Sequence, residues 1–167
     1  MTDASGKNWA PDYIYVTYIK TTPQKVWDAL TVPEFTRAYW THANISDWKP
    51  GSVWEHKTSE GRVLMHGKVV ESNPPKRLSF TWLAPSADNA EKDPALAIFD
   101  IETVGDMVRL TVTHTRLPAG AGMALNVAKG WPRVLSSMKS WLETGMALDT
   151  WAEFQTCDSQ PAAAAAE

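Results

Sequence analysis

The strongest constraint on the fold is the change in hydrophobic period along the chain. Residues 53–58, 63–71, 78–83, 96–103 and 108–115 are rich in apolar side chains that alternate with polar ones. This alternation is typical of β-strands with one buried face. Short connections that contain glycine or proline separate the runs, so we expect consecutive strands to pair as hairpins. The middle of the chain therefore predicts an antiparallel meander of about five strands.

One long amphipathic helix is predicted after the meander. Its apolar positions follow the 3.6-residue spacing, and they are Trp131, Leu135, Met138, Trp141 and Leu142. Because proline lacks the amide proton that a helix interior needs, Pro132 and its neighbour Trp131 are expected near the start of this helix or at a kink. A curved sheet with one apolar face needs a cover, and only this helix is long enough to provide it.

The start of the chain predicts one further strand and two short helices. Residues 13–19 are β-branched or aromatic and too few for a helix, which favours a strand. Thr22 followed by Pro23 is typical of a helix N-cap and first helical residue, and Pro33 begins a second short helix. The full order is a strand, two short helices, the meander and the long helix. It predicts an α+β fold.

Composition and charge narrow the class of protein. The 167 residues fit one domain, and 16 basic against 19 acidic residues give a net charge of −3. Nucleic-acid binding needs concentrated basic charge, so we do not expect a nucleic-acid partner. No apolar stretch approaches the length of a membrane span, and no signal peptide begins the chain. With Cys157 as its single cysteine, the chain is expected to be cytoplasmic and without disulfides.

The chain is expected to contain one domain with two less ordered ends. Residues 1–11 form an N-terminal arm, and residues 12–155 form the single domain. Residues 156–167 are rich in alanine and have no apolar pattern to pack, so we predict that they are disordered.

Several motifs in this order resemble the family of heat-shock-protein-90 ATPase activator homologues, a branch of the START-like (SRPBCC, birch-pollen-allergen-like) superfamily. The resemblance covers roughly residues 12–146. The motifs are residues 22–31 (TPQKVWDALT), Lys49-Pro50-Gly51, residues 67–71 (GKVVE), residues 75–82 (PKRLSFTW), residues 110–114 (LTVTH) and residues 130–145. Each motif alone is weak, but their order is specific to the family.

The resemblance implies a helix-grip fold, in which a curved antiparallel sheet wraps around the long C-terminal helix and leaves a cavity between them. Strand alternation and helix spacing place one set of side chains toward this cavity. The predicted ligand-binding residues are Trp54, His56, Phe80, Trp82, Phe99, Val112, His114, Trp131, Leu135, Met138 and Trp141. The same pattern would also build a solid core. The family's cavity and the nine tryptophans favour a pocket.

The polar groups near this pocket do not form a known catalytic or metal-binding motif. His56, His66 and His114 fall on separate strands without paired ligand spacing, so no metal is predicted. Acid–base catalysis needs two titratable groups that converge, and Glu55 and Asp100 alternate away from the cavity. His56 and His114 are either polar contacts at the cavity wall or structural histidines. No phosphate-binding loop is present, and no cofactor or catalytic residue is predicted.

Three functions follow, in order of preference. The first is binding of a small hydrophobic or aromatic molecule in the cavity, without catalysis. The second is an enzyme of the polyketide cyclase or aromatase type, with His56 and His114 as proton-transfer candidates. The third is a chaperone-associated interaction protein, which rests on the family name. The sequence does not decide whether the chain forms a homodimer. The sheet edges, or Trp151 and Phe154, are the candidate contacts of such a dimer.

Overall fold

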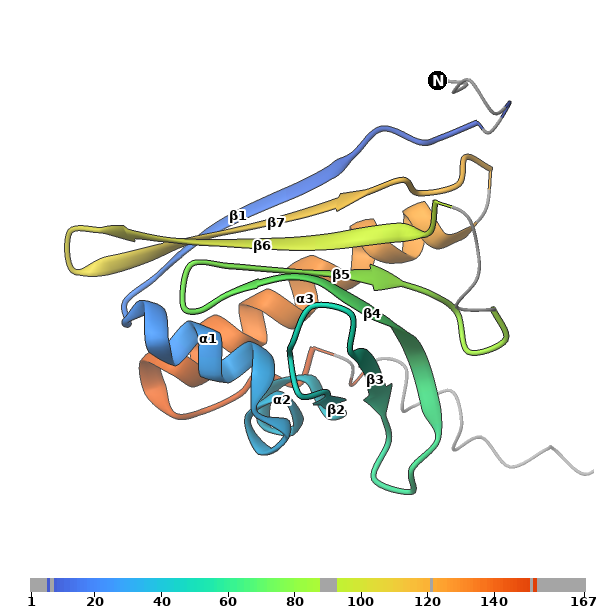
Figure 1. Cartoon of the computed structure of the whole chain (residues 1–167). Helices are drawn as coiled ribbons and strands as arrows, with labels where there is room; N and C mark the ends of the chain where they lie inside the picture. Colours follow the sequence, from blue (N-terminus) through green and yellow to red (C-terminus); the bar gives the residue numbers. More distant parts are fainter. Residues whose placement is uncertain (1–5, 7, 88–92, 121, 151, 153–167) are drawn as a thin grey trace, which may run out of the picture.

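A curved antiparallel sheet lies across one long helix in the computed structural model of the chain (Figure 1). The structure describes residues 6, 8–87, 93–120, 122–150 and 152, and within them seven strands pair in the order β1-β7-β6-β5-β4-β3-β2. The strands are β1 (Tyr13–Ile19), β2 (Ala43–Ile45), β3 (Val53–Lys57), β4 (Val63–Asn73), β5 (Arg77–Trp82), β6 (Ala95–Val104) and β7 (Met107–Thr115). The helices are α1 (Pro23–Thr31), α2 (Pro33–Trp40) and α3 (Gly122–Thr144). This arrangement confirms the predicted helix-grip fold.

Parts of the predicted domain organisation lie outside the described residues. They are most of the N-terminal arm, the alanine-rich segment 156–167, and the side chains of Trp151, Phe154 and Cys157. Of the arm, Trp9 forms an isolated bridge with Pro118, and the amide of Ala10 donates to the Leu117 carbonyl at 2.8 Å. The arm therefore continues the pairing between β1 and β7.

The two short helices have the capping that their sequence predicts. The Thr22 hydroxyl accepts a hydrogen bond from the Lys25 amide at 3.3 Å, and α1 begins at Pro23. The Tyr39 hydroxyl of α2 donates to the Ala29 carbonyl of α1 at 2.9 Å, and this bond fixes the angle between them. Together the two helices cover one end of the sheet, beside the C-terminal half of α3 (Figure 1).

The five predicted meander strands are β3 to β7, and the sequence patterns missed β2. With only three residues, β2 is too short to show a period. It forms because Asn44 lies opposite His56 of β3, and because the Thr36 hydroxyl accepts from the Asn44 amide at 2.9 Å. Tertiary contacts therefore create this strand.

Gly67 is required where β4 passes close to Thr81 of β5. A Cβ atom at Gly67 would lie 2.0 Å from the Thr81 carbonyl oxygen, so no side chain fits. The same oxygen accepts a hydrogen bond from the Trp54 indole Nε1 at 2.7 Å. This close approach of β4 to β5 therefore also satisfies the polar atom of a buried tryptophan.

The long helix begins earlier than the sequence analysis predicted. Trp131 was expected near its start, but it is the tenth of the 23 residues of α3. Met123 and Val127 lie on the same face, four residues apart, and extend the apolar stripe toward the N-terminus. Pro132 is inside the helix, where the carbonyl of the exposed Ala128 lacks its usual donor and can bond to water instead.

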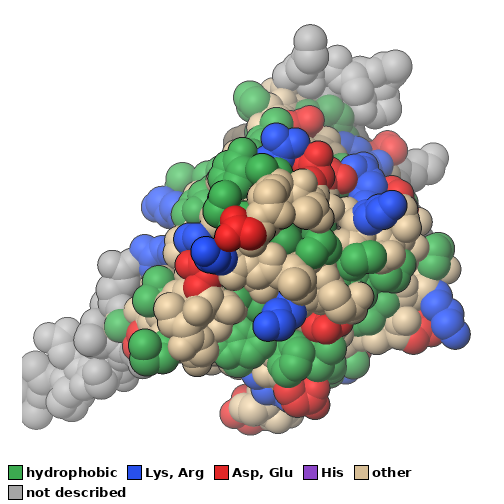
Figure 2. All heavy atoms as spheres, turned by 90° about the vertical axis from the view of Figure 1, so that its left-hand side faces the viewer, with side chains coloured by type: hydrophobic (Ala, Val, Ile, Leu, Met, Phe, Trp, Pro, Cys, Tyr) green, Lys and Arg blue, Asp and Glu red, His purple; other side chains and the backbone are tan. Residues whose placement is uncertain are grey.

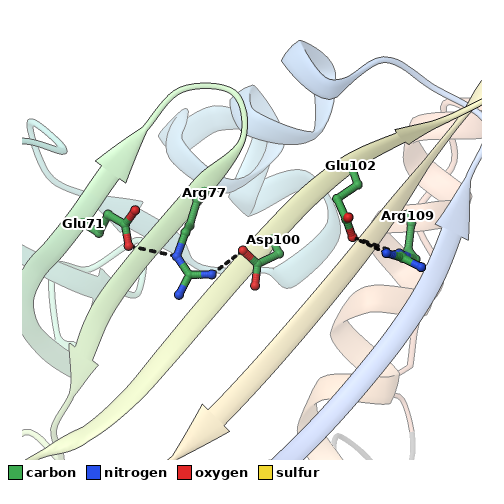
Figure 3. A network of polar contacts seen from close by, with 5 residues as sticks. All are labelled: Glu71, Arg77, Asp100, Glu102 and Arg109. Atoms are coloured by element: carbon green, nitrogen blue, oxygen red, sulfur yellow. Dashed lines mark hydrogen bonds and ion pairs between the residues drawn. The ribbon is translucent and has the colours of Figure 1, made fainter.

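The sheet face that points away from α3 carries paired charges. Arg77 of β5 bonds to Glu71 and Asp100, and Arg109 of β7 bonds to Glu102 of β6 (Figure 3). At the end of the molecule shown in Figure 2, acidic and basic side chains are interspersed with apolar ones. Among the helices that the structure describes, none combines the length and hydropathy needed to cross a bilayer.

Candidate functional site

Most of the side chains predicted to line a cavity form a packed core instead of an open wall. Trp54, Phe80, Phe99, Val112, His114, Leu135 and Met138 are each at most 2% exposed. The rings of Trp54 and Phe80 are 4.4 Å apart, and those of Phe80 and Phe99 are 5.5 Å apart. These distances are typical of aromatic side chains in contact. The space between the centre of the sheet and the C-terminal half of α3 is therefore filled.

An open groove lies next to this core, along the N-terminal half of α3. Its volume is about 760 Å³, and its aromatic wall consists of Trp40, Trp82 and Trp131. The Trp131 ring lies 5.5 Å from each of the other two, and these are 6.4 Å from one another. Met65 and Met123 complete the apolar wall. Three tryptophans from α2, β5 and α3 thus converge on one space.

The polar rim of this groove is basic. Lys129, Arg133 and Asn126 of α3 lie along it, and the described lining residues include no carboxylate. Apolar surroundings with two nearby cations favour a molecule that carries both an apolar body and a negative charge.

His114 lies behind Trp82 and Trp131 with one unpaired ring nitrogen. The Trp131 indole Nε1 donates to His114 Nδ1 at 3.2 Å, so the proton of the neutral ring is on Nε2. His114 Nε2 is buried and has no hydrogen-bond partner within the described part of the chain. Burial lowers the pKa of His114 to about 4, so the ring is neutral at pH 7.

His56 lies at the other side of the aromatic wall. Its Nδ1–H donates to Asn44 Oδ1 at 2.7 Å, and its ring is 4.4 Å from that of Trp40. Burial, together with the nearby His42, lowers the pKa of His56 to about 3. His56 and His114 therefore lie on the helix-facing side of the sheet as neutral rings. His66 is half-buried opposite Glu55 and does not join them.

The structure brings only part of the predicted site together. Trp82 and Trp131 line the groove, whereas Trp141 packs against Phe35 and Tyr39 of α2, with ring separations of 5.3 and 6.1 Å. Trp40 was not among the predicted lining residues, because its position depends on how α2 docks. Met123 was detectable, since it precedes Val127 and Trp131 at four-residue intervals.

Two other kinds of site find no support within the described residues. No three histidine, cysteine or acidic side chains come together there to hold a metal ion. A shallow hollow over the outer sheet face is lined by Lys76, Arg77, Asp100 and Glu102. Arg77 and Asp100 already bond to each other, so this hollow offers a ligand few free charges.

Comparison with known families identifies the chain. The model of the family "Activator of Hsp90 ATPase homolog 1-like protein" matches residues 20–143. The chain belongs to this family. The match begins just before α1 and ends near the end of α3, and it includes Trp40, Trp82 and Trp131. No curated protein sequence matches the chain.

Solved structures share the fold of this family member at low sequence identity. The Aha1 dimer from Colwellia psychrerythraea is 22% identical with a TM-score of 0.68, and the match covers 81% of this chain and 98% of that chain. CalU16 from Micromonospora echinospora is 18% identical with a TM-score of 0.64, with 80% and 77% covered. An HSP90 activator from Plasmodium falciparum is 19% identical with a TM-score of 0.66, with 78% and 95% covered.

Proposed function

We propose that the chain is a cytoplasmic binding protein for a small hydrophobic or aromatic molecule with an acidic group. The groove between β5, α2 and the N-terminal half of α3 is its binding site. The observation that carries the proposal is the convergence of Trp40, Trp82 and Trp131 on one open space with Lys129 and Arg133 at its rim. The apolar body of the ligand lies against the indole rings, and its acidic group lies near the two cations.

The size and chemistry of the groove support this function. Small-molecule sites commonly have volumes of about 300–1,000 Å³ and mostly apolar walls with few polar groups. At about 760 Å³, this groove is within that range. The half-buried Met65 and Met123 have flexible side chains that adapt to ligands of different shape. Among the groove-lining residues that the structure describes there is no acid–base pair, which favours binding over catalysis.

A substitution at Gly130 tests the binding site without disturbing the core. Gly130 lines the groove, and a Cβ atom there would have no neighbour within 4 Å. We expect Gly130→Leu to fold normally and to weaken binding of the anionic aromatic probe anilinonaphthalene sulfonate by about tenfold or more, because the leucine fills the groove. Gly130→Ala is the matched control and retains most of the affinity. Fluorescence titration measures both, and equal probe affinity in Gly130→Leu and the unmodified chain would contradict the site.

Self-association is a separate proposal that the dimeric Colwellia protein supports. The strand β1 forms one edge of the sheet, and its Ile14 and Val16 side chains are 62% and 47% exposed. An exposed apolar edge strand is a template for pairing with a second copy. We expect Val16→Lys to yield a monomer by light scattering. Val70→Lys, at an exposed position inside the sheet, is the control and leaves the mass unchanged.

Membership of this family suggests one candidate protein partner. The family is named for activators of heat-shock protein 90, and the Plasmodium falciparum relative in fold is described as one. We propose heat-shock protein 90 of the same organism as a candidate partner of this chain. A pull-down with the purified chaperone measures the association. Failure to recover a complex at micromolar concentrations of both proteins would remove this candidate.

A further inference from the structure

The chain reverses after α3 and returns along the helix. Gly145 has a φ of 78°, a left-handed conformation that allows the turn, and its amide donates to the Trp141 carbonyl at 2.8 Å. From there residues 145–150 run back toward the middle of α3 (Figure 1). The hydroxyl of Ser140 donates to the Met146 carbonyl at 2.8 Å, which is the first contact of this returning segment.

Two further residue pairs, each with two hydrogen bonds, hold the returning segment to α3. The Ser137 hydroxyl donates to the Leu148 carbonyl and accepts from the Leu148 amide, both at 3.1 Å. Arg133 Nη1 then donates to the Thr150 carbonyl at 3.0 Å, and the Thr150 hydroxyl donates to the Arg133 carbonyl at 3.4 Å. Thr150 is therefore fixed beside Arg133, which itself lies at the rim of the groove.

The groove begins where this segment ends. The helix positions that hold the segment, Ser140, Ser137 and Arg133, are three or four residues apart and form one stripe along α3. The same spacing continues from Arg133 to Gly130 and Asn126, which line the groove. One turn of helix advances about 5.4 Å, so the first residue after Thr150 needs only a few ångströms to reach the groove.

We propose that residues 151–156 of the same chain occupy the groove and compete with the external ligand. This proposal deepens the proposed function, because it names a second occupant of the same site. Trp151 and Phe154 are the apolar anchors, and Glu153 supplies charge opposite to that of Lys129 and Arg133. Ala152 is helical and exposed, and residues three apart in a helical turn share a face. Trp151 and Phe154 can then face the indole rings together.

The single cysteine allows the position of the segment to be measured without ligand. A nitroxide attached to Cys157 of the full chain broadens the amide signals of nearby residues in a nuclear magnetic resonance spectrum. We expect strong broadening at Asn126 and Lys129 and none at Glu102 on the opposite sheet face. In the variant with Trp151→Ala and Phe154→Ala, the broadening at Asn126 and Lys129 is lost. Unchanged signals at these two residues in the labelled parent chain would overturn the proposal.

Mixing distinguishes the same chain from a second copy. When nitroxide-labelled chain is mixed with isotope-labelled chain that carries no nitroxide, an intramolecular contact gives no broadening. Broadening of Asn126 and Lys129 in the mixture would show that the segment enters a partner's groove, and the proposal in its stated form would be wrong.

Probe binding measures the competition. We expect a chain that ends at Thr150 to bind anilinonaphthalene sulfonate about tenfold more tightly than the full chain, because the groove is no longer occupied. A chain that ends at Ser159 lacks only the alanine-rich end and is the control, with the affinity of the full chain. If neither form binds the probe but the nitroxide contact is present, the proposed function fails and this inference stands. Equal affinity of the Thr150-terminated and full chains would overturn the competition.

Discussion

The two halves of the interface between the sheet and α3 are both rich in aromatic side chains, yet only one is open. In one half, Leu135 and Met138 of α3 and Phe80 and Phe99 of the sheet are all at most 2% exposed. Around Met123 and Trp131, the groove remains. The difference arises from the cover: Phe35 and Tyr39 of α2 pack against Trp141 in the C-terminal half of α3, whereas in the N-terminal half Trp40 of α2 contacts Trp131 and borders the groove. Aromatic content therefore does not mark a pocket by itself.

Truncation of a methionine in each half gives the largest expected contrast. Met138 is fully buried and outside the groove lining. Met138→Ala should lower the free energy of unfolding by about 2–5 kcal/mol, because it leaves a cavity in a packed core. Met123→Ala should cost less stability, because this side chain is only half-buried, and should weaken binding of anilinonaphthalene sulfonate. Urea unfolding and probe titration measure the two effects. A larger change in probe affinity in Met138→Ala than in Met123→Ala would contradict the assignment of Met123 to the groove and of Met138 to the core.

The packed core around Trp54 also depends on Gly67, a position where no side chain fits. Gly67→Ala should destabilise the fold by about 1–3 kcal/mol, because its Cβ would overlap the Thr81 carbonyl and displace the oxygen that Trp54 bonds. The measurement is the urea midpoint, together with the fluorescence spectrum of the folded protein as a check on tryptophan environments. An unchanged midpoint would mean that β4 and β5 can move apart at this position without a loss of stability.

Two neutral histidines at the border of the halves make stability depend on pH. Burial lowers the pKa of His114 to about 4 and that of His56 to about 3, below the ordinary value of 6.5. The unfolded chain therefore binds protons that the folded chain does not. Their contribution to stability is complete above pH 6.5 and is lost as the pH falls toward about 4 for His114 and about 3 for His56. Each histidine adds a slope of up to about 1.4 kcal/mol per pH unit.

Urea unfolding between pH 5 and 6.5 measures this slope, and a variant assigns it. His114→Gln removes one titrating group but keeps an acceptor for the Trp131 indole, so the slope should fall by about half. A slope that is unchanged in His114→Gln would show that His114 is protonated in the folded protein or exposed to water.

The smallest expected effect is a gain in stability at the open half. Gly130→Ala should raise the free energy of unfolding by about 0.5–1 kcal/mol, because alanine favours the helix and its methyl group meets no neighbour within 4 Å. Thermal unfolding measures the gain. A loss of stability in place of this gain would mean that a methyl group at Gly130 clashes with a neighbouring atom in the folded protein.

Local sequence patterns were sufficient to predict most of the elements. The Thr22–Pro23 pair marks the start of α1, and alternation in β3 to β7 identifies the strands and their buried faces. These features depend on backbone geometry and on neighbours within a few residues, which the sequence contains directly. The exceptions were β2, whose Asn44 bonds to Thr36 and lies opposite His56, and the start of α3, where glycines and Pro132 obscured the period.

The sequence by itself determined which side chains of the long strands are buried, through their alternation. Only the tertiary structure decided which part of the space between the sheet and α3 is filled. Trp54, Phe80 and Met138 carry the same inward pattern as Trp82 and Trp131, and all five are buried in the core, but of these only Trp82 and Trp131 also border the groove. The period of the sequence shows on which face of its strand or helix a side chain lies. Whether space remains in front of it depends on how α2 and the ends of α3 dock, and therefore on contacts between residues far apart in the chain.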